Sequence, residues 1–232
     1  MMVYVYAIVD LPTIPMPAIL GLEGAALDTL PFQDIGAVVS RSATSKVPPI
    51  EANLWEHEAV VETLMADHAV LPMRFGTMLA DEAAVLEALT TRYDEFIAGL
   101  NCVRGHVELG LRVLWDDDVS LTPDRRVVPS GVSGRDYMLA QLDDQRKLDK
   151  RREQAKALAE DIHTTLARQS TRSTRQTLVT PRLLLTAAYL VKREQVEAFR
   201  QEVETLGSSN PEVRMLCTGP WPPYNFVMVN EK

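Results

Sequence analysis

The sequence predicts an α+β protein of two domains, and three observations lead to this prediction. The run from Met2 to Val9 is apolar on both faces and rich in β-branched and aromatic residues, which is typical of a covered strand. The run from Val103 to Trp115 alternates apolar and polar residues, as a strand with one wet face does. The polar segment from Asp116 to Ser133, which contains proline and glycine, then separates two halves of the chain.

Residues 1–118 are expected to form an N-terminal ferredoxin-like domain, a sheet with helices on one face. Pro72 lies in an extended segment between two helical patterns and indicates a position near a sheet edge. After the first strand the expected elements are a loop with a short helical turn at Gly21 to Thr29, a strand at Gly36 to Arg41, helices at Glu51 to His68 and Ala80 to Leu100, and an extended segment at Val70 to Thr77 between them.

Residues 119–217 are expected to form a smaller C-terminal α+β domain that begins with a long helix. Ser133 and Asp136 resemble a capping box at its start. The signs of the charges alternate from Asp143 to Glu153, which favours a solvated, salt-bridged helix surface. The expected elements are a helix to about Gln169, a polar linker at Ser170 to Gln176, a strand at Leu178 to Val191, a helix at Glu194 to Leu206 and a strand at Glu212 to Thr218.

Residues 218–232 form a tail that is stiff for a chain terminus. Its prolines, Pro220, Pro222 and Pro223, fix backbone angles, so little conformational freedom is lost when the tail docks. Its aromatic residues supply apolar surface to bury. The groove that receives them lies either in this chain or in a partner; we favour the first, a tail clamp made by Pro220, Trp221, Pro222, Pro223, Tyr224 and Phe226.

Composition and charge exclude several function classes. The chain of 232 residues carries a net charge of −8, which argues against a nucleic-acid partner and against electrostatic attachment to a lipid membrane. We expect no secretory signal peptide, and no apolar run approaches the ~20 residues of a membrane span. Cys102 and Cys217 are expected to be buried free thiols in a reducing cytosol.

The titratable residues give no pattern of an active site. His57-Glu58 begins like a zinc-protease motif, but Val61 occupies the position of the second ligand. His57 and His68 share a helix face, yet they lie roughly 16 Å apart along it and cannot share one metal ion. Nucleophile elbows, paired-cysteine motifs and phosphate-binding loops are missing from the sequence. We therefore predict no enzyme, no metal and no cofactor.

Three sequence motifs together resemble the gas vesicle protein F/L family. They are the opening strand YVYAIV (Tyr4 to Val9), the helix with His57-Glu58 that leads into VLPMRFGT (Val70 to Thr77), and the closing TGPWPPYNFV (Thr218 to Val227). They span nearly the whole chain in the family's order. The compact length favours the F branch over the L branch.

The resemblance implies an accessory protein of gas vesicles that is not an enzyme. It implies two α+β domains and a C-terminal tail that ties back onto the body. It also implies a minor structural component in the cytoplasm, associated with the vesicle shell and binding the small hydrophobic shell subunit.

Our hypothesis is that the N-terminal domain binds the shell subunit through apolar residues of the first strand and of VLPMRFGT. The alternative is an adaptor that recruits other accessory proteins through the charged long helix. For Arg74 two interpretations stay open, an ion-paired arginine under a turn or a rim contact for a partner. The candidate partner or structural residues are Tyr4, Tyr6, Leu71, Pro72, Met73, Arg74, Phe75 and Gly76.

Overall fold

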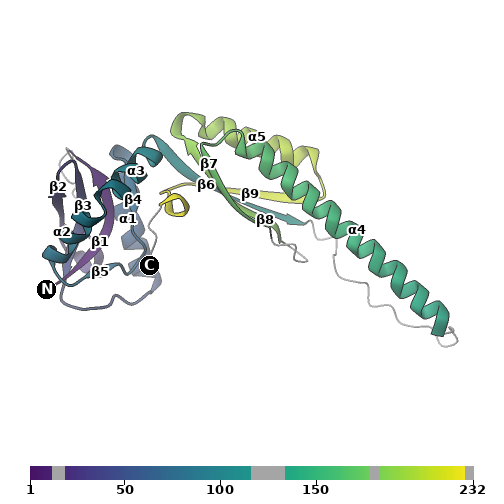
Figure 1. The fold of residues 1–232 in the computed structure, drawn as a ribbon, viewed down its shortest axis with the longest axis horizontal. Helices are drawn as coiled ribbons and strands as arrows, with labels where there is room; N and C mark the ends of the chain where they lie inside the picture. The colour runs from purple at the N-terminus through teal and green to yellow at the C-terminus, as the bar shows by residue number, and fades with distance from the viewer. Residues whose placement is uncertain (12–18, 116–133, 178–182, 228–232) are drawn as a thin grey trace. The chain divides into compact units, whose positions relative to one another are not determined.

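The computed structural model describes the chain except residues 12–18, 116–133, 178–182 and 228–232 (Figure 1). The predicted capping box at Ser133 and the first residues of the predicted strand from Leu178 therefore lie outside the described residues. The chain divides into two compact units. The first contains Met1–Glu108 together with Pro220–Lys232, and the second contains Leu109–Gly219.

The sheet of the first unit is antiparallel and has the strand order β2-β3-β1-β4, with β5 also paired to β1. Strand β1 is central, because β3 pairs along one edge of it and β4 and β5 along the other. Its register with β3 shifts between Val5 and Ala7. The strands are β1 (Met2–Asp10), β2 (Leu27–Phe32), β3 (Ile35–Ser42), β4 (Val70–Pro72) and β5 (Met78–Leu79).

Helices cover both faces of this sheet, so the predicted arrangement with helices on one face is wrong. One face packs Val3, Val5 and Ile8 against helices α2 (Glu82–Thr91) and α3 (Tyr93–Val103). On the other face, Tyr4 and Tyr6 contact His57 of helix α1 (Glu51–Asp67). The reason lies in β1, where every residue from Val3 to Val9 is buried and both faces need a cover.

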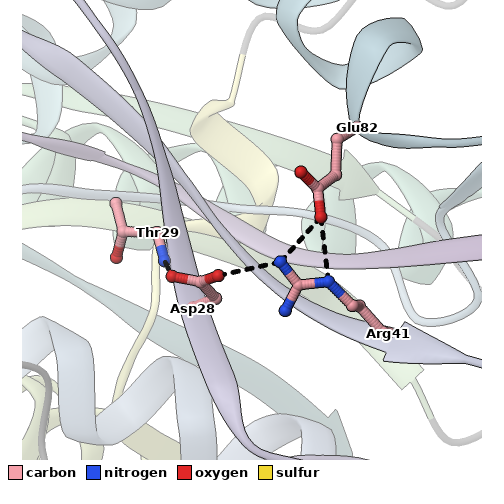
Figure 2. A network of polar contacts seen from close by, with 4 residues as sticks. All are labelled: Asp28, Thr29, Arg41 and Glu82. Atoms are coloured by element: carbon pink, nitrogen blue, oxygen red, sulfur yellow. Dashed lines mark hydrogen bonds and ion pairs between the residues drawn. The ribbon is translucent and has the colours of Figure 1, made fainter.

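Strand β2 occupies a region where the sequence predicted a loop with a turn of helix. Only a short 3-10 turn, Leu22–Gly24, is helical there. Pro31 obscures the strand pattern, but β2 ends the strand order, where a missing N–H is tolerated. Arg41 of β3 forms ion pairs with Asp28 of β2, at 3.0 Å, and with Glu82 of α2, at 2.7 Å. Figure 2 shows these side chains. These side chains are about half exposed, so the pairs fix geometry more than they add stability.

The predicted helix from Ala80 to Leu100 is broken into α2 and α3 at Arg92. Arg92 has φ −114° and ψ 21°, outside the helical region. Its N–H still donates to the Ala88 carbonyl, and its own carbonyl accepts from the Phe96 N–H. The break lets each short helix bury its own apolar side chains, Val85 and Leu89 from α2 and Phe96 and Leu100 from α3.

The second unit carries the ferredoxin-like succession β-α-β-β-α-β, which the sequence had placed in the N-terminal half. Its sheet has the order β7-β8-β6-β9. In the first unit three strands precede the first helix, so the ferredoxin-like prediction was wrong there. The elements are β6 (His106–Trp115), α4 (Gly134–Ala167), β7 (Arg172–Thr177), β8 (Leu183–Lys192), α5 (Val196–Ser209) and β9 (Val213–Trp221).

Strand β7 was missed, because the sequence predicted a polar linker there. The strand has the sequence RSTRQT, without apolar alternation, and it pairs with β8 from Arg172↔Leu190 to Thr177↔Leu185. As an edge strand it needs one partner only and no buried face. The formation of β7 is therefore determined by its backbone hydrogen bonds to the apolar strand β8, rather than by its own side chains.

Only the C-terminal part of α4 packs into the core of the second unit. Ala155, Ala159, Ile162 and Leu166 are buried there beside Phe199 of α5. Among the described side chains of α4 before Ala155, none is buried. The start of the helix also exposes large apolar side chains, namely Tyr137, Met138, Leu139 and Leu142.

Candidate functional site

The turn that follows β4 contains the second half of the VLPMRFGT motif. Gly76 has φ +85°, a conformation that any residue with a Cβ adopts only with strain. The Thr77 N–H and the Thr77 hydroxyl both donate to the Arg74 carbonyl, at 3.1 and 2.7 Å. The turn, residues 73–77, is therefore closed by its own backbone.

Two buried side chains hold this turn from beneath. The Gly76 N–H donates to the Tyr4 hydroxyl at 2.9 Å, and the Tyr4 hydroxyl lies 3.0 Å from Nδ1 of His57. His57 Nε2 lies 3.1 Å from the Met73 carbonyl oxygen. Because a carbonyl only accepts, we assign the ring proton to Nε2, and Nδ1 then accepts from the Tyr4 O–H.

Burial keeps this network neutral. It raises the pKa of Tyr4 to about 12 and lowers the pKa of His57 to about 4. The ring of Tyr6 stacks on His57 at 5.6 Å between centroids, and its hydroxyl accepts from the Leu22 N–H at 2.8 Å. The Tyr6 hydroxyl also lies 3.0 Å from the Ser40 hydroxyl, so it has two polar partners. His57 is therefore a structural residue, because each of its two ring nitrogens has a hydrogen-bond partner.

The candidate partner residues differ in their access to solvent. Tyr4, Tyr6, Leu71 and Pro72 are buried, and β1 is a central strand, so these residues cannot contact a partner directly. Met73 and Phe75 are half-buried, whereas Arg74 and Gly76 are exposed. A partner surface at this motif is therefore restricted to the turn, with the buried residues as its support.

A groove lies beside the turn, and five of its eight lining residues were not among the sequence candidates. Its volume is about 470 Å³. Trp55 and Leu54 of α1 are 63% and 44% exposed, and Ile50 just before the helix is 55% exposed. Helical spacing in the sequence placed Leu54 on the buried face of the helix. Trp55 lies outside that buried stripe, and this position was the signal in the sequence for an exposed apolar surface. The groove is lined by Glu51, Leu54, Trp55, His57, Glu58, Arg74, Phe75 and Tyr224.

Acidic side chains accompany the apolar ones in this groove. Glu51 accepts a hydrogen bond from the Trp55 indole N–H at 3.3 Å, which orients the ring. Glu58 accepts from the Tyr224 hydroxyl at 2.9 Å, and burial raises the pKa of Glu58. The groove thus combines large exposed apolar groups with charged side chains of both signs, since Arg74 also lines it.

The last described residues dock onto the first unit. Asn225 donates its backbone N–H and its amide N–H to the two carboxylate oxygens of Glu108, at 2.8 and 2.6 Å. Phe226 is 4% exposed, and Pro222 and Pro223 are buried. These contacts support the tail clamp, which stays a proposal.

Trp221 does not have the position that the tail prediction gave it. Thr218 to Trp221 continue strand β9, and the Trp221 side chain is 39% exposed. Truncation of a buried aromatic ring to alanine costs ~3 kcal/mol or more. The buried aromatic ring of the tail is that of Phe226, so we expect this cost for Phe226→Ala and not for Trp221→Ala.

The described residues show no other site of recognisable chemistry. No group of His, Cys, Asp or Glu side chains in this part of the chain could hold a metal ion. Neither Cys102 nor Cys217 forms a disulfide, and both are half-buried rather than buried as predicted. None of the described helices is long and apolar enough to cross a membrane.

The chain was compared with known proteins and structures. The family model "Gas vesicle synthesis protein GvpL/GvpF" matches residues 2–228. Gas vesicle protein L of a Streptomyces strain is 32% identical over 185 residues, 76% of this chain and 69% of that protein. Gas vesicle protein F2 of Halobacterium salinarum is 26% identical over 231 residues, 98% and 92% of the two chains.

The crystal structure of GvpF from Anabaena has a TM-score of 0.80 at 19% identity, over 99% of this chain and 97% of that one. It shows that the two proteins share a mixed α/β fold with antiparallel sheets. Relatives of both the F and the L type match, so the preference for the F branch stays a prediction. The family match over residues 2–228 shows that the chain belongs to the GvpL/GvpF family of gas vesicle synthesis proteins.

Proposed function

We propose that this chain binds the hydrophobic shell subunit of gas vesicles through the groove between α1 and the turn at residues 73–77. Family membership gives the chain a role in gas vesicle formation. The observation that carries the proposal is the set of large apolar side chains, Ile50, Leu54 and Trp55, left exposed beside a rigid turn. We expect the protein to be associated with the vesicle shell and to act there without catalysis.

The groove suits an apolar segment of a partner. Trp55 and Leu54 already lie in one groove with Phe75, so a partner side chain inserted there would be surrounded on several sides. Burying an aromatic ring of this kind is worth on the order of 2 kcal/mol. Shell subunits must be kept from aggregating before they join the wall, and a site that covers their apolar surface would do this.

The rigidity of the turn favours binding. Tyr4 and His57 fix Gly76 and Met73 from the buried side, so the turn loses little conformational entropy when a partner docks. Glu51 and Glu58 add negative charge to the groove. Arg74 lines the same groove, so its charge is mixed, and we expect the apolar residues of the bound segment to provide most of the contact.

The test uses the full chain and purified shell subunit. The double variant Leu54→Ala, Trp55→Ala should bind at least about tenfold more weakly, since each truncation removes apolar contact area. The matched control is Met138→Ala, Leu142→Ala, which removes equally exposed apolar groups from α4. Unchanged binding by the first variant would refute the proposal. An isolated fragment of residues 1–115 is a poorer tool, because it lacks the docked residues Tyr224 and Phe226.

The alternative function is an adaptor for other gas vesicle accessory proteins. The observation that favours it is the start of α4, where Tyr137, Met138, Leu139 and Leu142 are exposed ahead of the charged stretch from Asp143 to Glu153. An unpacked helix with exposed apolar groups is a common docking element. Charge reversal over Asp143 to Glu153 that removes accessory partners and leaves shell-subunit binding intact would favour the adaptor.

A further inference from the structure

The sheet of the second unit has one face toward its helices and one face away from them. On β6 and β9, odd-numbered residues join or pack against the core shared with α4 and α5; they include Leu109, Leu111, Val113, Val213, Met215 and Cys217. Because side chains alternate along a strand, the even-numbered residues between them point to the opposite face. A Cβ on Gly110 would lie only 2.8 Å from Oγ1 of Thr218, so the even-numbered residues of the two neighbouring strands lie side by side.

The face away from the helices carries arginine and leucine side chains where β6 and β9 meet. Arg112 and Arg214 are exposed, and neither guanidinium has an ion pair or a side-chain hydrogen bond within the described part of the chain. Leu216 is 39% exposed, and Leu114 is half-buried. We call these four residues the basic sheet face.

The acids near this face leave it positive. Glu108 points to the same side of β6, but it is buried, and its two carboxylate oxygens both accept from Asn225. Glu212, just before β9, is exposed and adds one negative charge against the two arginines. Arginine stems pack along apolar neighbours while the guanidinium stays in water, so exposed arginine beside leucine suits a partner that is both acidic and apolar.

An acidic and apolar surface of this kind lies on α1. Four of its residues follow each other at spacings of four, three and four and therefore lie on one stripe of the helix. This stripe, the acidic ridge, consists of Glu51, Trp55, Glu58 and Glu62. Trp55 is 63% exposed, and α1 contains no lysine or arginine. Arg74 lines the adjacent groove, and the ridge remains acidic with it included.

We infer that the acidic ridge of one copy of this chain docks on the basic sheet face of a second copy. Trp55 packs against the two leucines of the face, and the carboxylates of the ridge lie beside Arg112 and Arg214. The opposite charges of the two surfaces favour this contact although the whole chain carries a net charge of −8. Because ridge and face are different surfaces, the contact is heterologous, and the assembly closes into a ring or grows as a chain.

The test uses the full chain alone. The inference shares Trp55 with the proposed function, but no shell subunit is present, so either one can fail without the other. Analytical ultracentrifugation over a concentration series up to about 1 mM, where weak protein contacts are half formed, should show an average mass that rises above that of the monomer. The association should weaken about tenfold between ~0.05 and ~1 M salt, because salt screens exposed charges.

Charge reversal examines the two surfaces separately. The face variant Arg112→Glu, Arg214→Glu should associate at least about tenfold more weakly, because its face then repels the ridge. The ridge variant Glu51→Lys, Glu62→Lys should weaken association by a similar factor for the same reason. The chain with all four replacements should recover most of the lost association, because opposite charges meet again.

The control is Lys150→Glu, Arg151→Glu on the exposed part of α4, which changes the net charge by the same amount as the face variant. Its association should change less than about threefold, and thermal melting first establishes that each variant is folded. A chain that stays monomeric at every concentration would overturn the inference. Self-association that survives either charge reversal, or that the four combined replacements do not restore, would place the contact elsewhere and would overturn it as well.

Discussion

Among the described residues, each unit has a tyrosine–histidine hydrogen bond of the same length, and the two differ in their surroundings. Tyr4 and His57 in the first unit lie 3.0 Å apart and are both buried. Tyr189 and His163 in the second unit also lie 3.0 Å apart, but His163 is half-buried. Burial lowers the pKa of both histidines, and to about 4 for His57.

The two pairs also differ in the groups that they hold outside the pair. His57 Nε2 and the Tyr4 hydroxyl also hold the Met73 carbonyl and the Gly76 N–H, so this pair fixes the turn beside the groove. The pair in the second unit borders a core that is otherwise apolar, with Tyr189 packed on Phe199 at 5.1 Å. The first pair therefore shapes a candidate surface, whereas the second packs the end of a helix onto its sheet.

Replacing the two histidines should show the largest difference. His57→Ala removes a buried ring and leaves the Met73 carbonyl without its donor, so the free energy of unfolding should fall by roughly 2–4 kcal/mol. His163→Ala should cost about 1 kcal/mol or less, since water reaches a half-buried site. Urea unfolding of the two variants measures both values, and equal losses would contradict the comparison.

Acid should expose the same difference in the unaltered chain. The pKa of His57 lies at about 4 in the folded state, below its ordinary 6.5, so the unfolded chain binds the proton first. The stability from neutral His57 is fully present above pH 6.5 and is lost as the pH falls towards 4, to a total of about 3 kcal/mol.

Glu58 and Glu108 act in the opposite direction in acid, because burial raises their pKa values and their protonation favours the folded state. Urea unfolding at several pH values, with His57→Ala as the reference, isolates the histidine contribution. The same pH dependence in the variant and the unaltered chain would show that His57 is not responsible.

Removing single hydroxyl groups sharpens the comparison. Tyr4→Phe keeps the packing of the ring but leaves the Gly76 N–H and His57 Nδ1 unsatisfied, at a cost of about 1–3 kcal/mol. Tyr189→Phe should cost less than about 1 kcal/mol, because His163 Nδ1 can turn to water. In differential scanning calorimetry, Tyr4→Phe should have a lower melting temperature than Tyr189→Phe. A lower melting temperature for Tyr189→Phe would contradict the account.

A small effect is expected from the Tyr224 hydroxyl, where the tail meets α1. Tyr224→Phe removes the hydrogen bond to Glu58, which is partly buried, and should cost about 1 kcal/mol. Phe226→Ala removes a side chain that is 4% exposed and should cost about 3 kcal/mol. This variant measures the loss of tail packing, against which the loss of the Tyr224 hydroxyl is compared. A Tyr224→Phe loss as large as that of Phe226→Ala would show that the hydroxyl, rather than the ring packing, holds the tail.

The elements that were predicted correctly are those whose own side-chain pattern determines whether they form a strand or a helix. Strand β1 is apolar on both faces, and α4 has a long helical pattern; both are found where expected. Strands β2 and β7 were missed, because Pro31 and a polar sequence hide edge strands that depend on backbone pairing with a neighbour. The two-sided character of β1 also pointed to helices on both faces, which the ferredoxin-like prediction did not use.

The candidate site was only partly accessible from the sequence. VLPMRFGT was singled out, but its link to Tyr4 and His57 depends on hydrogen bonds between residues far apart in the chain. The exposure of Leu54 and Trp55 follows from which face of α1 meets the sheet, and helical spacing alone placed Leu54 on the wrong face. No motif marks the break between α2 and α3 at Arg92.

The measurement that tests the proposed function most directly is site-specific crosslinking to the shell subunit. A photo-crosslinking amino acid placed at position 55, in the groove, should form a covalent adduct with the shell subunit. The same group at position 139, on the exposed start of α4, should not. Adducts from position 139 and none from position 55 would contradict binding at the groove and would favour the long helix as the contact.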